Sequence, residues 1–76
     1  MKNAIEFLVW EISHDSELKD YLLTEISKKT TKISTNTSDI KIDYFKKTVE
    51  IYNASESAKI FFQIVPLNDF IKEINK

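Results

Sequence analysis

Residues 3–29, NAIEFLVWEISHDSELKDYLLTEISKK, decide what the rest of the chain has to pack against. They contain the only Trp, the only His and the longest apolar run of the protein. At about 100° per residue, the spacing of an α-helix, their aliphatic side chains gather on one side. We therefore predict an N-terminal helix. The side chains on its apolar side are Ala4, Ile5, Leu8, Val9, Ile12, Leu18, Leu22 and Ile26.

The middle of this stretch favours a break in the helix. Residues 13–16, SHDS, are rich in side chains that bond the local backbone and favour helix caps over helix interiors. The helix is thus predicted to kink or to restart near Asp15. A second interpretation stays open, because residues 5–12 alone have the aromatic and β-branched content of a buried strand. In that alternative residues 3–12 form a strand and the helix starts at Ser16.

A second stripe of side chains runs beside the aliphatic one. It consists of Phe7, Trp10, His14 and Tyr21 and makes the predicted helix wider than one core can easily cover. One hypothesis is a partner-binding groove or a dimer interface, since Trp and Tyr are favoured interface residues. The alternative is ordinary core, because aromatic residues at helical spacing usually pack inward.

The composition excludes several classes of site. The chain has 76 residues and contains no Cys, no Gly and no Arg. It is one domain near the lower size limit for a single core, without disulfides or thiolate metal sites. A chain without Gly has no Gly-rich phosphate loop, and one without Arg has no bidentate phosphate clamp. The formal net charge of −1 gives no long-range attraction to nucleic acid or to an anionic membrane.

We expect no cofactor and no metal ion. Glu11, His14 and Glu17 are spaced so that a helix would place three potential ligands along one side. A metal site of that kind needs such residues from several helices, so a solvated or capping cluster is the favoured interpretation. Glu6 and Glu11 interrupt the first apolar run, which argues against a secretion signal, and no run reaches membrane-spanning length. We expect a cytoplasmic protein that does not enter a membrane.

The period of the apolar residues changes to two after a polar connector at residues 30–38. A short edge strand through Ile33 is an alternative for part of that connector. Apolar and polar residues then alternate over residues 39–45, 48–52 and 58–65, a pattern typical of three antiparallel strands. If Ile51 lies opposite both Ile42 and Ile60, the three strands share one apolar face. That face would be built by Ile40, Ile42, Tyr44, Val49, Ile51, Ile60, Phe62 and Ile64.

The chain is predicted to end in a short helix. Pro66 ends the third strand because it has no backbone N–H to donate to a ladder. Leu67, Phe70, Ile71 and Ile74 then follow the spacing of an amphipathic helix. The predicted fold is one α+β domain over residues 1–76, in the order helix, three-stranded antiparallel meander, helix. If residues 3–12 form a strand, the order becomes β-α-β-β-β-α.

The face of the sheet opposite the helices is the first candidate site. The predicted register places the aromatic side chains of Phe45, Tyr52 and Phe61 there, beside charged ones. Three exposed aromatic side chains on one face are unusual for a lone monomer. The alternative is that the first helix or a second copy of the chain covers this face. The candidate partner-binding residues are Tyr52, Phe61, Phe45, Asp43, Glu50, Lys41 and Lys59.

These features favour a small non-enzymatic protein that binds another protein through an aromatic and charged surface. Inhibitors, immunity proteins and small phage or mobile-element proteins have this character. One alternative is a single-stranded nucleic-acid binder that stacks bases on Tyr52 and Phe61. The predicted pair of Asp43 and Glu50 counts against it, because adjacent acids repel phosphate. A structural homodimer is the other alternative.

Overall fold

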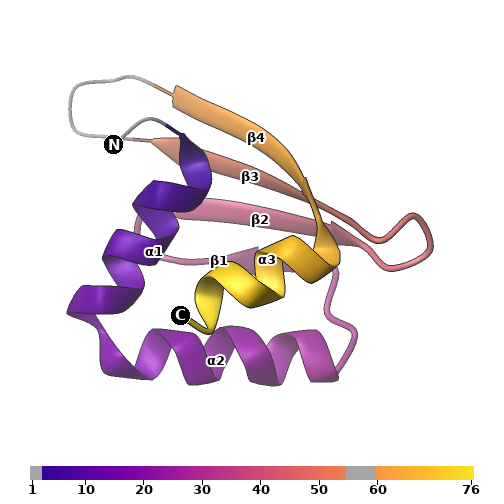
Figure 1. Ribbon diagram of the computed structural model, residues 1–76, viewed down its shortest axis with the longest axis horizontal. Helices are drawn as coiled ribbons and strands as arrows, with labels where there is room; N and C mark the ends of the chain where they lie inside the picture. Colours follow the sequence, from indigo (N-terminus) through magenta and orange to yellow (C-terminus); the bar gives the residue numbers. More distant parts are fainter. Residues whose placement is uncertain (1–2, 55–59) are drawn as a thin grey trace.

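Three helices lie on one face of a four-stranded antiparallel sheet (Figure 1). The computed structural model describes residues 3–54 and 60–76. The strands follow one another in the sheet in the order β1-β2-β3-β4. The elements are α1 (Ala4–His14), α2 (Ser16–Ser27), β1 (Lys32–Ser34), β2 (Ser38–Asp43), β3 (Thr48–Ala54), β4 (Ile60–Pro66) and α3 (Leu67–Ile74).

Asp15 divides the predicted N-terminal helix into α1 and α2. Its backbone is extended, with φ −141° and ψ 99°, and its N–H donates to the carbonyl of Ile12 at the end of α1. Its carboxylate accepts from the N–H of Glu17, 3.1 Å away, and so caps the start of α2. The predicted break near Asp15 is confirmed, and the alternative strand at residues 3–12 is wrong. The two helices then run in different directions across the sheet (Figure 1).

The sheet has one strand more than the predicted meander. β1 lies inside the predicted polar connector and pairs with β2, so that Ile33 faces Ile40 and is buried. The turn between them is held by Thr35, whose hydroxyl accepts from the backbone N–H groups of Thr37 and Ser38. Only the alternative edge strand through Ile33 anticipated β1, because one buried residue among polar ones is a weak pattern.

The register between β2 and β3 differs from the predicted one by two residues. Ile42 lies opposite Val49 instead of Ile51. The connection is longer than predicted because Asp43 closes it: its carboxylate accepts from the N–H groups of Phe45 and Lys46. Lys47 completes the turn with φ 57°. A shift of two residues leaves each side chain on its face, so the predicted apolar face of β2 and β3 is confirmed.

The register between β3 and β4 reverses the predicted orientation of β4. Ile51 lies opposite Gln63, where the alternating pattern placed Ile60. A difference of three residues moves every β4 side chain to the other face of the sheet. Gln63 and Val65 therefore face the helices, and Phe62 and Ile64 face away from them.

Two contacts to α1 hold β4 in this orientation. The ring of Phe61 packs against Phe7 with the centroids 5.1 Å apart. The side-chain oxygen of Gln63 accepts from the backbone N–H of Ile5, 3.1 Å away, in the first turn of α1 where that group has no helical partner.

The core lies between the sheet and the helices. α3 starts directly after Pro66 and, as predicted, turns Phe70 and Ile74 inward, where both are fully buried. Its contacts reach α1, β3 and β4, so it closes the same side of the sheet that α1 and α2 cover. The buried apolar residues are Ala4, Ile5, Leu8, Leu18, Leu22, Ile33, Ile40, Ile42, Val49, Ile51, Val65, Phe70 and Ile74.

We predict that Phe70→Ala lowers the free energy of unfolding by about 3–5 kcal/mol, because it empties a fully buried aromatic site. Lys72→Ala on the exposed side of the same helix is the matched control and should change it by less than about 0.5 kcal/mol. Urea denaturation followed by circular dichroism measures both. Equal losses in the two variants would contradict the packing of α3.

Candidate functional site

The candidate site is the face of the sheet turned away from the helices, called here the outer face. Alternation along the strands and the observed registers assign its side chains. No helix among residues 3–54 and 60–76 covers it (Figure 1). The described outer-face residues are Lys32, Ser34, Asp39, Lys41, Asp43, Thr48, Glu50, Tyr52, Phe62, Ile64 and Pro66.

Three large apolar side chains form a ridge over β3 and β4. Tyr52 and Phe62 lie opposite each other and their ring centroids are 4.6 Å apart, at an interplanar angle of 34°. Ile64 follows on the same face of β4. Tyr52 is 45% exposed, Phe62 50% and Ile64 56%. We call these three residues the outer ridge, and we note that contiguous apolar exposure of this kind marks contact surfaces.

Charged residues border the outer ridge on the side of β2 and β1. Asp39 lies opposite Tyr52, and Lys41 lies opposite Glu50. The predicted pairing of Asp43 with Glu50 is wrong, because the longer turn places Asp43 opposite Thr48. An opposite-charge pair of Lys41 and Glu50 stands where a like-charge pair was predicted, and such cross-strand pairs stabilise a sheet.

The predicted outer-face residues separate into different places. Tyr52, Lys41, Asp43 and Glu50 lie on the outer face as predicted. Phe61 does not: it points toward the helices, is half-buried and touches Phe7, because the register of β4 is reversed. The described residues do not include Lys59.

Phe45 lies beyond the sheet, in the turn between β2 and β3. Its side chain is 95% exposed, the highest value among the large apolar residues described. The turn itself is well held. The carboxylate of Asp43 accepts a hydrogen bond from the backbone N–H of Phe45. The hydroxyl of the neighbouring Tyr44 donates to the backbone carbonyl of Thr30, 2.6 Å away. Phe45 is therefore an exposed ring on an ordered turn.

Tyr44 ties this turn to the end of α2. The ammonium group of Lys29 lies 5.1 Å from the centre of the Tyr44 ring, a cation–π contact. Partial burial raises the pKa of Tyr44 above its ordinary value, and the negative charge of Glu25 raises it further. Lys29 at its ring and Thr30 at its hydroxyl thus both hold Tyr44 in place.

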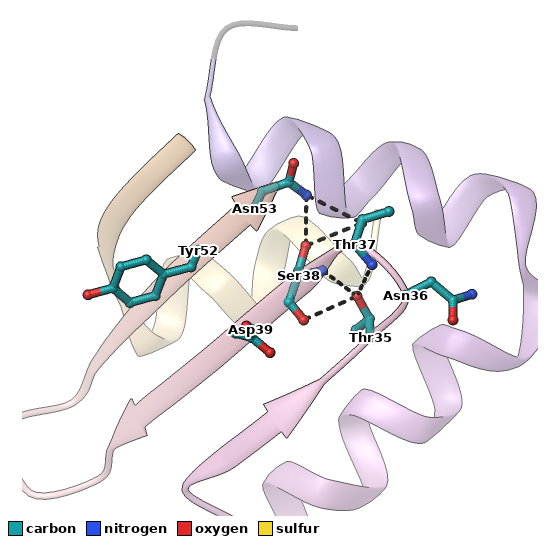
Figure 2. Close-up of a pocket in the computed structure, with 7 residues that line it drawn as sticks. All are labelled: Thr35, Asn36, Thr37, Ser38, Asp39, Tyr52 and Asn53. Atoms are coloured by element: carbon teal, nitrogen blue, oxygen red, sulfur yellow. Dashed lines mark hydrogen bonds between the residues drawn. The ribbon is translucent and has the colours of Figure 1, made fainter. Parts of the chain in front are cut away.

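An open hollow of about 510 Å³ adjoins the outer ridge at the end where β1 turns into β2 (Figure 2). Tyr52 borders it, so it is continuous with the ridge. The polar groups beside the hollow already bond one another: the amide nitrogen of Asn53 donates to Ser38 at 2.8 Å and to Thr37 at 3.3 Å. Its lining residues are Thr35, Asn36, Thr37, Ser38, Asp39, Tyr52 and Asn53.

Glu11 holds this turn from the side of α1. Its side chain is buried, and one carboxylate oxygen accepts hydrogen bonds from the hydroxyls of Thr35 and Thr37. The side-chain Oδ1 of Asn53 points away from Thr37 and Ser38 and has no partner among the described residues (Figure 2). These bonds connect α1 to the β1–β2 turn and support one border of the outer face.

The sequence analysis missed the position of Glu11. Its spacing from Ala4 and Leu8 (i, i+4, i+7) places it on the buried side of α1, so the signal was present. Glu11, His14 and Glu17 do not come together, since Glu11 is buried and the other two are exposed. Within residues 3–54 and 60–76 there is no group of three His, Cys, Asp or Glu able to hold a metal ion.

The stripe proposed as a second surface is not continuous. Phe7 turns inward to Phe61, whereas Trp10 is 47% exposed and stacks on His14 with the ring centroids 4.4 Å apart. A ring nitrogen of His14 lies 2.9 Å from the carbonyl oxygen of Trp10, which fixes the stack on α1. Tyr21 is on α2, beyond the break at Asp15. The break therefore leaves Trp10 and His14 as a small exposed pair.

Comparison with protein-family models, with curated proteins and with solved structures finds no match for this chain. Of the helices in the described part of the chain, none has the length and apolar character needed to cross a bilayer. The proposals below therefore rest on the residues of this protein alone.

We predict that replacing two neighbouring phenylalanines lowers the free energy of unfolding by different amounts. Phe61→Ala should lower the free energy of unfolding by about 2 kcal/mol, because a half-buried ring against Phe7 is lost. Phe62→Ala, its matched control, should lower it by less than about 1 kcal/mol, since half of that ring is already in water. Denaturation at low protein concentration gives both values. A larger loss for Phe62→Ala would mean that the two faces of β4 are assigned the wrong way round.

Proposed function

We propose that this protein is a small non-enzymatic interaction module that binds another protein through its outer face. The observation that carries the proposal is the outer ridge, three large apolar side chains each about half exposed on a sheet face that no helix of the described residues covers. A monomer stabilises itself by burying such side chains, so leaving them in water has a cost that binding a partner would remove.

The surroundings of the outer ridge fit a protein partner. An apolar centre with aromatic rings and a polar, charged rim is the usual anatomy of a protein interface. Tyr52 and Phe62 supply the rings, and their mutual contact at 4.6 Å orders them before any partner binds. Asp39, Lys41 and Glu50 supply the rim. The partner we expect presents an apolar patch bordered by groups that complement these charges.

The charges favour a protein over a nucleic acid as the ligand. The described outer face carries three acids, Asp39, Asp43 and Glu50, against Lys32 and Lys41. Proteins that stack single-stranded bases combine aromatic rings with a positive groove that follows the phosphates. Here an acid, Asp39, lies directly opposite Tyr52, and its negative charge would repel a phosphate close to that ring.

The turn with Phe45 gives the proposed module an inhibitor-like feature. The backbone of this turn is held by hydrogen bonds, so it loses little conformational freedom on binding, and the exposed ring can enter a pocket of a partner. Inhibitor and immunity proteins act by occupying a surface in this way, without chemistry of their own. We propose this class of function, with Phe45 as a second contact beside the outer ridge.

The test is capture of a binding protein from a lysate of the native cells, with Tyr52→Ala as the variant and Tyr21→Ala as its control. The two tyrosines are exposed to the same extent, 45% and 44%, and Tyr52 lies on the outer face of the sheet whereas Tyr21 is on α2. We expect Tyr52→Ala to weaken capture by at least about tenfold and Tyr21→Ala to leave it unchanged. The thermal midpoint of both variants should move little, which separates lost binding from lost folding.

Equal capture by the two variants would contradict the proposal. Capture that vanishes after nuclease treatment, or that falls steeply between low and physiological salt, would instead identify a nucleic acid as the ligand.

A further inference from the structure

The two edges of the sheet are built differently. β1 is an edge of only three residues and carries Lys32, and short charged strands are the usual protection of a sheet edge against pairing. β4 is an edge of seven residues, and its sequence, IFFQIVP, has no charged side chain. Within the strand itself, only Pro66, at its last position, limits pairing. The β4 edge thus lacks the protection that the β1 edge has.

The unpaired backbone groups of β4 include those of Phe62 and Ile64, in the middle of the strand. The N–H of Leu67 donates to the carbonyl of Lys47 at 2.8 Å, which extends the β3–β4 ladder by one bonded pair. In an antiparallel ladder bonded and non-bonded pairs alternate. Counting back from Leu67 in steps of two, residues 65, 63 and 61 bond to β3. The N–H and C=O groups of Phe62 and Ile64 therefore point the other way, away from β3 in the plane of the sheet. No residue of the described chain bonds to these groups.

We propose that the β4 edge pairs in antiparallel fashion with the β4 edge of a second copy of this chain. A strand paired with its own copy about a twofold axis offers each outward N–H a matching C=O. No like charges meet, because the strand has none. The net charge of −1 adds little repulsion between copies. The result is one continuous sheet of eight strands with all helices on the same side.

The pairing places the outer ridges of the two copies side by side. Phe62 and Ile64 stand at the border of the outer face, so in the dimer each gains neighbours from the other copy and loses exposed apolar area. The proposed protein-binding face becomes a single surface twice as wide. This inference concerns the edge and not the face, so it does not depend on the proposed function.

The register of the pairing is restricted. The groups that point to the free edge belong to every second residue of β4. The two copies of β4 can therefore pair only in registers that place one residue directly opposite the same residue of the other copy. For a strand centred between Ile60 and Pro66, that residue is Phe62, Gln63 or Ile64. Cα atoms that face each other across an antiparallel pair are close enough for a disulfide.

The experiment uses this restriction in a chain that has no Cys of its own. Phe62→Cys, Gln63→Cys and Ile64→Cys are oxidised mildly, with Tyr21→Cys on α2 as the exposed control. We expect one of the three β4 variants to form a disulfide-linked dimer at least about ten times faster than the control, and its two neighbours to react slowly. Similar rates in all four variants would overturn the proposal.

Sedimentation equilibrium of the unmodified chain gives an independent measurement. The interface is small, so we expect the mean mass to rise from monomer toward dimer between roughly 10 µM and 1 mM. Ile64→Lys should abolish that rise by placing a charge on the edge. A monomer throughout, even at the highest concentration, would also overturn the proposal. Tyr52→Ala should keep the dimer, so loss of self-association and loss of partner capture are separate results.

Discussion

The pairing of Tyr52 with Phe62 across the β3–β4 ladder is the constraint on which the rest of the surface depends. Successive residues of a strand face opposite sides, so the register that contains this pair goes with one direction for every side chain in β4. Phe61 then reaches Phe7, and Gln63 reaches the backbone of Ile5, which attaches α1 to the sheet. The same pairing sends Phe62 and Ile64 to the outer face. Core and candidate interface are thus two consequences of one register.

Much of the fold could be predicted because most segments obey a single period. The helical spacing of residues 3–29 and the amphipathic end of the chain predicted a helix at each end, and the cap residue Asp15 predicted the kink or restart that separates α1 from α2. The faces of β2 and β3 followed from strict alternation. β4 could not be predicted in this way, because apolar residues occupy both of its faces: Phe61 and Val65 on one, Phe62 and Ile64 on the other.

The deciding information for β4 lies in contacts between distant segments. Phe7 selects Phe61 as the inward ring, and no local pattern contains that preference. The wrong register of β4 also made the predicted outer face partly wrong. Its residues on β2 and β3 were predicted correctly: Tyr52, Lys41, Asp43 and Glu50. On β4, Phe62 and Ile64 were missed and Phe61 was placed on the wrong side. Glu11 is a milder case, since helical spacing already placed it inward and only its hydroxyl partners were unknown.

The central claim, that Phe62 lies opposite Tyr52 and so faces away from the helices, has a direct measurement. In an antiparallel ladder the α-protons of a non-bonded pair approach closely and give a strong nuclear Overhauser effect. The account predicts such contacts between Tyr52 and Phe62 and between Glu50 and Ile64. Contacts of Val49 with Phe62, or of Ile51 with Ile60, would contradict it, because they belong to the register that turns Phe62 toward the helices.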